Sequence, residues 1–361
     1  MNLEYKKRSD YDALSQDELK ARITARKSEL GKRLVILAHH YQREEIVPFG
    51  DYLGDSLILS QKAASQKEAE YIVFCGVNFM AEAAEILSQP HQKVYLPNPD
   101  AGCYLADCAN KPDVDKAWAE ITQVVAADSI VPCVYINSNA ELKAFCGDRG
   151  GLTCTSSNAD KALDWGMAHG ERIFFFPDQH LGRNTAKRKG FTEDERILWN
   201  PVLPLGGNTE EEIKRSKIIL WDGNCCVHMN FTAEMVEARR RQYPGIKVIV
   251  HPESREEVVD AADAAGSTKN IVEYLQNAKE GESIAIGTEW SMVNRVAKEF
   301  PQLNVMNLAK EPLRPICETM YITSLADLLY TIENLDSIEP VRVAENVKAG
   351  AKTALNRMLE L

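Results

Sequence analysis

Imidazole, phenol and amide side chains stand where three apolar runs of the sequence end. The runs span residues 35–38, 131–136 and 247–250. The side chains that follow them are, in order, His39 with Tyr41, Asn137, and His251. Short apolar runs that stop on such groups are typical of buried parallel strands, which deliver side chains to their carboxyl ends. Because ligands bind at that edge of open α/β sheets, we expect the three ends to face one pocket.

Histidines at strand-to-loop junctions are the first candidates for chemistry. Three such residues are His39, His228 and His251. In contrast, His91 and His169 lie among polar residues typical of a protein surface, and we expect no function for them.

Hydroxyl side chains begin three predicted helices. They are Ser56, Thr155 with Ser156, and Ser267 with Thr268. Each could simply cap its helix. A helix N-terminus that faces a pocket also binds carboxylate or phosphate, through its free amides and its dipole. The spacing leaves both interpretations open.

Nine cysteines are more than idle thiols would explain, and they leave metal or catalytic use of some thiols open. Their number is odd, and no C-x-x-C pair occurs. A disulfide framework is therefore not expected. Cys103, Cys225 and Cys317 each follow a turn containing glycine or proline, and three thiolates of this kind could hold Zn²⁺ or an iron–sulfur cluster. The spacing does not choose between these metals. Of the others, Cys108 and Cys226 are ambiguous, and three lie in apolar settings, namely Cys75, Cys133 and Cys146.

The elements that must position these groups recur in three rounds of strand, polar turn and helix. The predicted strands are 35–38, 71–75 and 93–96, then 131–136, 172–176 and 216–221, then 247–250, 283–289 and 304–308. Strands that alternate with helices favour parallel βαβ units, and three rounds favour three similar α/β lobes. We assign 1–97 with 319–361 to the first lobe, 98–218 to the second and 219–318 to the third. Within the second lobe, residues 182–209 break the pattern, and this basic, glycine-containing insert predicts either a cationic flap or an exposed connection.

The overall composition indicates a globular enzyme. Of 361 residues, 45% are hydrophobic and 26% are charged, which excludes a fibre or a disordered chain. A net charge of −11 argues against nucleic acid as a partner. The N-terminus has no apolar signal region, and the longest apolar stretch, near 130–136, is too short to span a membrane and contains Pro132. We therefore expect a cytoplasmic protein with small-molecule partners and no membrane contact.

The candidate residues named above lie within a dozen short motifs that follow one another along the chain. The motifs are Ala38-His-His-Tyr-Gln42, Gly54-Asp-Ser56, Cys75-Gly-Val-Asn-Phe-Met-Ala-Glu82, Ala101-Gly-Cys103, Tyr135-Ile-Asn-Ser138, Cys154-Thr-Ser156, Pro177-Asp-Gln-His-Leu-Gly182, Trp221-Asp-Gly-Asn-Cys225 with Val227-His228, His251-Pro-Glu253, Gly266-Ser-Thr268, Ile286-Gly-Thr-Glu289 and Cys317-Glu-Thr-Met320. Over almost its whole length the chain resembles the quinolinate synthases.

The resemblance implies an α/β fold of three pseudo-symmetric three-layer αβα lobes, with short parallel sheets around a central active site. It also implies one [4Fe–4S] cluster per chain, held by Cys103, Cys225 and Cys317. The fourth iron would have no protein ligand, so it could act as a Lewis acid on the substrate.

The reaction implied by the resemblance belongs to NAD biosynthesis and is a transferase reaction. Iminoaspartate and dihydroxyacetone phosphate condense to quinolinate, with release of phosphate and two waters. A functional coupling to an enzyme that produces iminoaspartate is left open.

Roles for individual residues also follow from the resemblance. The implied catalytic groups are Tyr41 as acid/base, Glu253 as base and His228 on the proton path. The implied substrate-binding groups are His39, Ser56, Tyr135, Asn137, Ser156, His251, Ser267 and Thr268. Ser254 and Tyr321 depart from residues common in the family, cysteine and lysine respectively. Two alternatives stand beside this hypothesis: a non-catalytic iron–sulfur sensor, and a zinc-dependent aldolase or lyase using the same thiolates.

Overall fold

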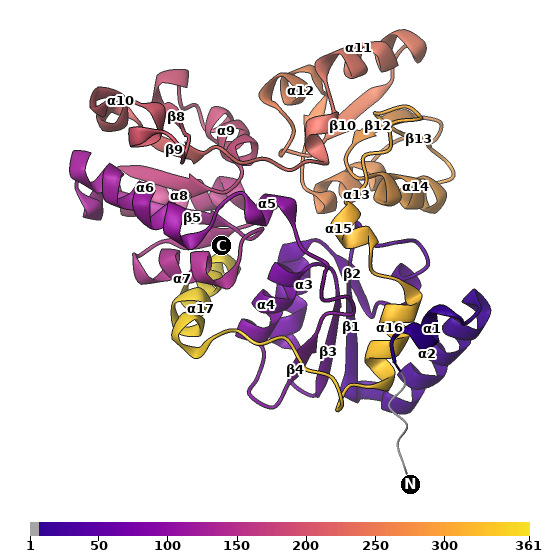
Figure 1. Ribbon diagram of the computed structural model, residues 1–361. Coiled ribbons are helices and arrows are strands. Elements are labelled where there is room, and N and C mark those ends of the chain that lie inside the picture. The colour runs from indigo at the N-terminus through magenta and orange to yellow at the C-terminus, as the bar shows by residue number, and fades with distance from the viewer. Residues whose placement is uncertain (1–6) are drawn as a thin grey trace. The chain divides into compact units, whose positions relative to one another are not determined.

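The computed structural model describes residues 7–361, which form two compact units. The first unit contains the chain up to Cys103 and the segment Cys317–Val343. The second contains Tyr104–Ile316 and Ala344–Leu361. Figure 1 labels the helices and strands of both.

A four-stranded parallel sheet forms the centre of the first unit, in the order β2-β1-β3-β4. Its strands are β1 (Leu34–His39), β2 (Tyr52–Gly54), β3 (Tyr71–Cys75) and β4 (Lys93–Tyr95). Its helices are α1 (Ser9–Asp12), α2 (Gln16–Leu30), α3 (Ser56–Ser65), α4 (Asn78–Leu87), α15 (Glu318–Tyr321) and α16 (Leu325–Glu333). Ile36 and Ala38 of β1 pack with α2 and α16 in one apolar cluster. Strand alternation therefore sends His39 to the opposite face.

Two parallel sheets build the second unit, in the orders β6-β5-β7-β9-β8 and β11-β10-β12-β13. The five-stranded sheet comprises β5 (Ile130–Tyr135), β6 (Leu152–Cys154), β7 (Arg172–Phe176), β8 (Arg196–Trp199) and β9 (Ile218–Trp221). The four-stranded sheet comprises β10 (Lys247–Val250), β11 (Ala264–Ala265), β12 (Ser283–Gly287) and β13 (Asn304–Asn307). The accompanying helices are α5 (Tyr104–Asp107), α6 (Lys111–Val124), α7 (Ala140–Asp148), α8 (Ala159–His169), α9 (Gln179–Arg188), α10 (Glu210–Arg215), α11 (Ala233–Gln242), α12 (Glu256–Ala261), α13 (Thr268–Gln276), α14 (Trp290–Glu299) and α17 (Glu345–Glu360).

The three sheets share one topology, because in each the first strand lies between the second and the third. Helices flank all three, so the predicted three-layer α/β fold with short parallel sheets is confirmed. The strand order reverses beside β1, β5 and β10, and that switch point is where such sheets bind ligands. The three-lobe boundaries stay a prediction.

Residues 182–209 are a regular part of the second unit. They contribute most of α9 and the extra edge strand β8, which pairs with β9 in parallel. The basic side chains that suggested a flap are ion-paired, for example Arg183 with Glu193 and Arg188 with Asp160. The segment is therefore integrated into the sheet and its covering layer.

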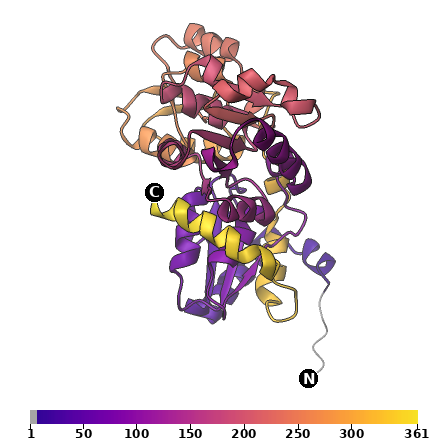
Figure 2. The ribbon, with the colours of Figure 1, turned by 90° about the vertical axis from the view of Figure 1, so that its left-hand side faces the viewer.

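The C-terminal helix α17, seen lengthwise in Figure 2, packs against α7 within the second unit. Glycine permits this close approach, because a Cβ on Gly147 would lie 1.9 Å from the carbonyl oxygen of Gly350. Asn158, just before α8, donates a hydrogen bond to the Met358 carbonyl (3.1 Å). The end of the chain thus supports the start of α8.

Within residues 7–361, no helix combines the length and the apolar character that crossing a bilayer would require.

Candidate active site

The ends of β5 and β10 bring a phenol and a carboxylate together in the second unit. Tyr135 is the last residue of β5, and its hydroxyl donates a hydrogen bond to Oε1 of Glu253. Glu253 lies in the turn that follows β10. Both residues are buried, and they come from different sheets. The structure therefore joins two of the predicted strand ends.

Two histidines complete this buried polar group. His228 Nδ1 lies 2.9 Å from Oε2 of Glu253, and its Nε2 lies 3.1 Å from the Thr288 hydroxyl. Its ring stacks on that of His251, with centroids 4.4 Å apart. An ionised carboxylate can only accept hydrogen bonds, so Nδ1 of His228 carries the proton that faces Glu253.

The electrostatics of the group keep its carboxylate charged and its phenol neutral. Burial alone would raise the pKa of Glu253, but the charge of His251 and the hydrogen bond and charge of His228 outweigh it and lower that pKa to about 2. Burial, followed by the negative charge of Glu253, raises the pKa of Tyr135 well above its ordinary value. Tyr135 is thus a hydrogen-bond donor to an ionised Glu253.

Asp178 is a neighbouring group that the sequence analysis did not select. It caps α9 by accepting a hydrogen bond from the Leu181 amide (2.7 Å), and it is fully buried. Burial, together with the charge of Glu253, raises its pKa well above the ordinary range. The signal was present, because Asp178 follows the predicted strand 172–176 as His251 follows 247–250.

Hydroxyls from two helix starts approach the same region. Ser157 donates a hydrogen bond to the Ser267 hydroxyl (2.7 Å), and Ser267 caps α13. Ser156 is hydrogen-bonded to Tyr135. Among the residues that the structure describes, the buried oxygens Asn137 Oδ1 and Thr268 Oγ1 have no hydrogen-bond partner. Those two atoms are available to a ligand.

Three of the predicted catalytic and substrate-binding residues, His39, Tyr41 and Ser56, belong to the first unit. His39 ends β1, and its Nδ1 accepts a hydrogen bond from the Tyr41 amide (3.2 Å), with the two rings edge to face. Ser56 is the first residue of α3, but the cap is Asp55, whose side chain accepts from the Ile58 amide (2.8 Å). The capping explanation therefore does not apply to Ser56.

The predicted metal ligands fall in both units. Cys103 and Cys317 belong to the first unit, and Cys225 lies in the loop after β9 of the second. Donor atoms of Cys225, His228 and Glu253 lie within 4.8 Å of one another. This places one thiol directly beside the buried polar group.

Comparison with known proteins decides the family. A family model described as quinolinate synthetase A protein matches residues 21–360. A quinolinate synthase of Corynebacterium glutamicum is 47% identical over 355 residues, covering 98% of this chain and 90% of that protein. One from Geobacillus sp. (strain WCH70) is 47% identical over 370 residues, covering 99% of each chain. The chain belongs to the quinolinate synthase family.

The cysteines of this quinolinate synthase family member divide into two classes by burial. Cys75, Cys133, Cys146 and Cys154 are buried. Burial raises the pKa of the Cys75 thiol to about 12, and it raises the pKa values of Cys146 and Cys154 well above their ordinary range. Four others, Cys103, Cys108, Cys225 and Cys317, are partly exposed, and Cys226 is exposed. The three predicted ligands, Cys103, Cys225 and Cys317, lie in loops or at a helix start. Iron–sulfur clusters take thiolate ligands, and zinc takes them together with imidazole and carboxylate. Each of these three cysteine side chains therefore offers a donor of the type that such a metal centre uses.

Proposed function

We propose that this protein is a quinolinate synthase that condenses iminoaspartate with dihydroxyacetone phosphate. The products are quinolinate, phosphate and two waters, in a transferase reaction that serves NAD biosynthesis in the cytoplasm. The observation that carries the proposal is the buried set of Tyr135, Glu253 and His228 beside the thiol of Cys225. Coupling to an enzyme that produces iminoaspartate is part of the proposal.

The cofactor we propose is one [4Fe–4S] cluster held by Cys103, Cys225 and Cys317. When bound, such a cluster with three protein ligands supplies a Lewis acid that assists the loss of hydroxide. Support comes from membership of the family and from the position of the Cys225 thiol, whose sulfur lies within 4.8 Å of donor atoms of His228 and Glu253.

Anion binding is the first task of the protein side chains, since the substrates carry carboxylates and a phosphate. We assign it to hydroxyl, amide and imidazole groups at strand ends and helix starts. They are His39, Ser56, Tyr135, Asn137, Ser156, His251, Ser267 and Thr268. Support comes from the buried Thr268 hydroxyl, which has no hydrogen-bond partner among the described residues and can donate to an anion, and from the N-terminus of α13.

Proton transfer is the second task, which we assign to Glu253, His228 and Tyr41. Ionised Glu253 is a weak base while Tyr135 and His228 both donate hydrogen bonds to it. A substrate that displaces the Tyr135 hydroxyl would remove one of these donors and raise the basicity of Glu253. Because Nδ1 of His228 at 2.9 Å already carries a proton, a proton taken by Glu253 would stay on its carboxyl group. His228 would take part in the proton path through its other nitrogen, Nε2, which lies 3.1 Å from the Thr288 hydroxyl.

A zinc-dependent aldolase or lyase is the second candidate, and one observation favours it. Cys225, His228 and Glu253 offer the sulfur, nitrogen and oxygen donors that catalytic zinc sites use. The sensor alternative has no such support, because the relatives are named as synthases.

One anaerobic experiment tests the proposal against both alternatives. Protein purified without oxygen is analysed for iron, sulfide and zinc, and is then assayed for quinolinate with both substrates and with each one omitted. We expect equal iron and sulfide, and quinolinate only in the complete mixture. Stoichiometric zinc without sulfide would favour the lyase, and an intact cluster without turnover would favour the sensor.

A further inference from the structure

Helix α9 contacts both loops that carry the candidate active site of the second unit. At its start, the Gln179 amide donates to the Gly223 carbonyl (2.9 Å), and the Gln179 side chain donates to Asp222 (2.7 Å). Those contacts hold the loop that leads to Cys225. Further along the helix, Asn184 reaches the turn that carries Glu253.

The Asn184 side chain forms hydrogen bonds with the turn on both sides of Glu253. Its side-chain nitrogen lies 2.8 Å from the carbonyl oxygen of Pro252 and 2.8 Å from that of Ser254. Carbonyl oxygens only accept, so both contacts are donated by the two N–H groups of one amide. Asn184 and Ser254 are buried, at 4% and 0% exposure, so water does not compete for these bonds.

The backbone of the turn determines where the Glu253 carboxylate points. The turn begins at His251, directly after β10. Within the turn, the Ser254 amide donates a backbone hydrogen bond to the His251 carbonyl (3.0 Å). Glu253 must reach Tyr135 and His228 from this short segment. A small rotation of either flanking peptide would move the carboxylate away from both partners.

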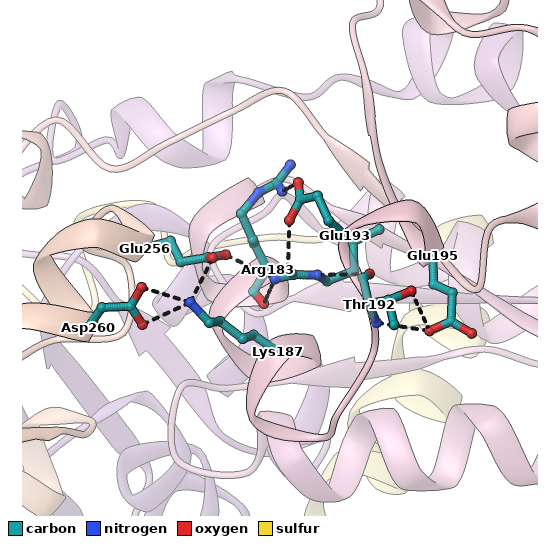
Figure 3. Close-up of polar contacts among 8 residues, drawn as sticks. Arg183, Lys187, Thr192, Glu193, Glu195, Glu256 and Asp260 are labelled. Atoms are coloured by element: carbon teal, nitrogen blue, oxygen red, sulfur yellow. Dashed lines mark hydrogen bonds and ion pairs between the residues drawn. The ribbon is translucent and has the colours of Figure 1, made fainter.

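Ion pairs outside the turn cannot replace this contact. Lys187 of α9 pairs with Glu256 (2.9 Å) and Asp260 (2.7 Å) of α12, as Figure 3 shows. The Lys187 side chain is 41% exposed, so water and salt screen these pairs. They fix α12 rather than the residues beside Glu253.

We propose that Asn184 is a positioning residue that holds the Glu253 carboxylate toward Tyr135 and His228. This inference rests on the proposed function, in which Glu253 moves a proton. Asn184 touches no reacting group itself. It acts through the two peptide groups that flank Glu253.

The test compares Asn184→Ala with a matched control, Asn208→Ala. Asn208 also donates its side-chain amide to backbone carbonyls of the same unit, those of Leu198 (2.8 Å) and Gly206 (3.2 Å), but at the β8 loop. For Asn184→Ala we expect kcat to fall about 10- to 100-fold, because a displacement of about 1 Å costs that much. The KM values should stay within about twofold, since a loss confined to the transition state lowers kcat. The control should keep kcat.

Hydrogen exchange measured by mass spectrometry gives a readout independent of turnover. Exchange should accelerate in the peptide covering 251–258 of Asn184→Ala and stay unchanged there in Asn208→Ala. If wild-type protein makes no quinolinate, the proposed function fails, and this exchange comparison still decides whether Asn184 holds the turn.

Several outcomes would overturn the inference. A wild-type kcat in Asn184→Ala, or unchanged hydrogen exchange over 251–258, would show that the turn keeps its conformation without the Asn184 hydrogen bonds. Equal losses of kcat in both variants would indicate a merely structural effect. If Asn184→Ala does not fold, Asn184→Ser takes its place, with the same pattern expected in kcat and exchange and the same results counting against it.

Discussion

Two carboxylates of the second unit, Glu253 and Glu256, are three residues apart but differ in burial and in their partners. Glu253 is buried and has Tyr135 and His228 as partners. Glu256 is partly exposed and pairs with the exposed Lys187 and with Arg196, whose side chain is buried. A buried charge depends on every partner, because water cannot replace a lost one. The exposed pair with Lys187 tolerates change. Substitution of Glu253 should therefore affect activity, and substitution of Lys187 should affect little beyond local stability.

Adjacent cysteines at the edge of the buried group should show the largest difference. Cys225→Ser should lose the cluster and all activity, because a serine hydroxyl does not replace a thiolate ligand. Cys226→Ser is the matched control, since Cys226 is exposed, and it should keep both. Iron and sulfide content and visible absorbance measure the effect. Loss of the cluster in Cys226→Ser alone would reverse the choice of ligand.

Within the buried group, Tyr135→Phe should have a smaller effect. It removes the hydrogen bond to Glu253 and leaves the ring in place. A hydrogen bond to a charged group contributes about 1.5–3 kcal/mol, so kcat/KM should fall roughly 10- to 100-fold. Steady-state kinetics at unchanged cluster content provide the measurement. An unchanged kcat/KM would remove Tyr135 from the site.

The dependence of stability on acid pH should reveal the lowered pKa of the buried Glu253 carboxylate. The pKa of Glu253 falls from an ordinary 4.5 to about 2 on folding. A lowered pKa stabilises the fold above pH 4.5, and this part of the stability is lost as the pH falls through 4.5 toward 2. Urea unfolding across that range should show a steeper loss for wild type than for Glu253→Gln. Parallel curves would contradict the lowered pKa.

The smallest effect is expected at the surface cluster of Figure 3. Lys187→Met removes the ion pairs with Glu256 and Asp260 but keeps the aliphatic stem. The free energy of unfolding should change by under about 1 kcal/mol, less at high salt, and kcat should not change. Urea unfolding at two salt concentrations measures this. A large loss of kcat would mean that these pairs, rather than Asn184, hold the Glu253 turn.

Sequence reasoning located the long strands and the groups at their ends. The runs at 35–38, 131–136 and 247–250 correspond to β1, β5 and β10, because a short, mainly apolar run that ends on polar groups marks a buried parallel strand. The edge strands β2, β6, β8 and β11 were not predicted. With two to four residues each, they are too short to show a clear periodicity.

Contacts across the site could not be predicted from the spacing of residues alone. Tyr135 and Glu253 are 118 residues apart and lie on different sheets, so their hydrogen bond exists only in three dimensions. The basic insert shows the same limit, since its sequence left a cationic flap and an exposed connection equally open. The acidic partners of Arg188 and Lys187, Asp160 and Asp260, stand far from them in the chain.

The most direct measurement is an anaerobic assay for quinolinate with wild type and Glu253→Gln side by side. Glutamine keeps the shape of Glu253 but cannot accept a proton as a carboxylate does. We predict turnover by wild type and a loss of about 10²- to 10⁴-fold in kcat for the variant, at equal iron and sulfide content. Near-normal quinolinate formation by Glu253→Gln with an intact cluster would contradict the account.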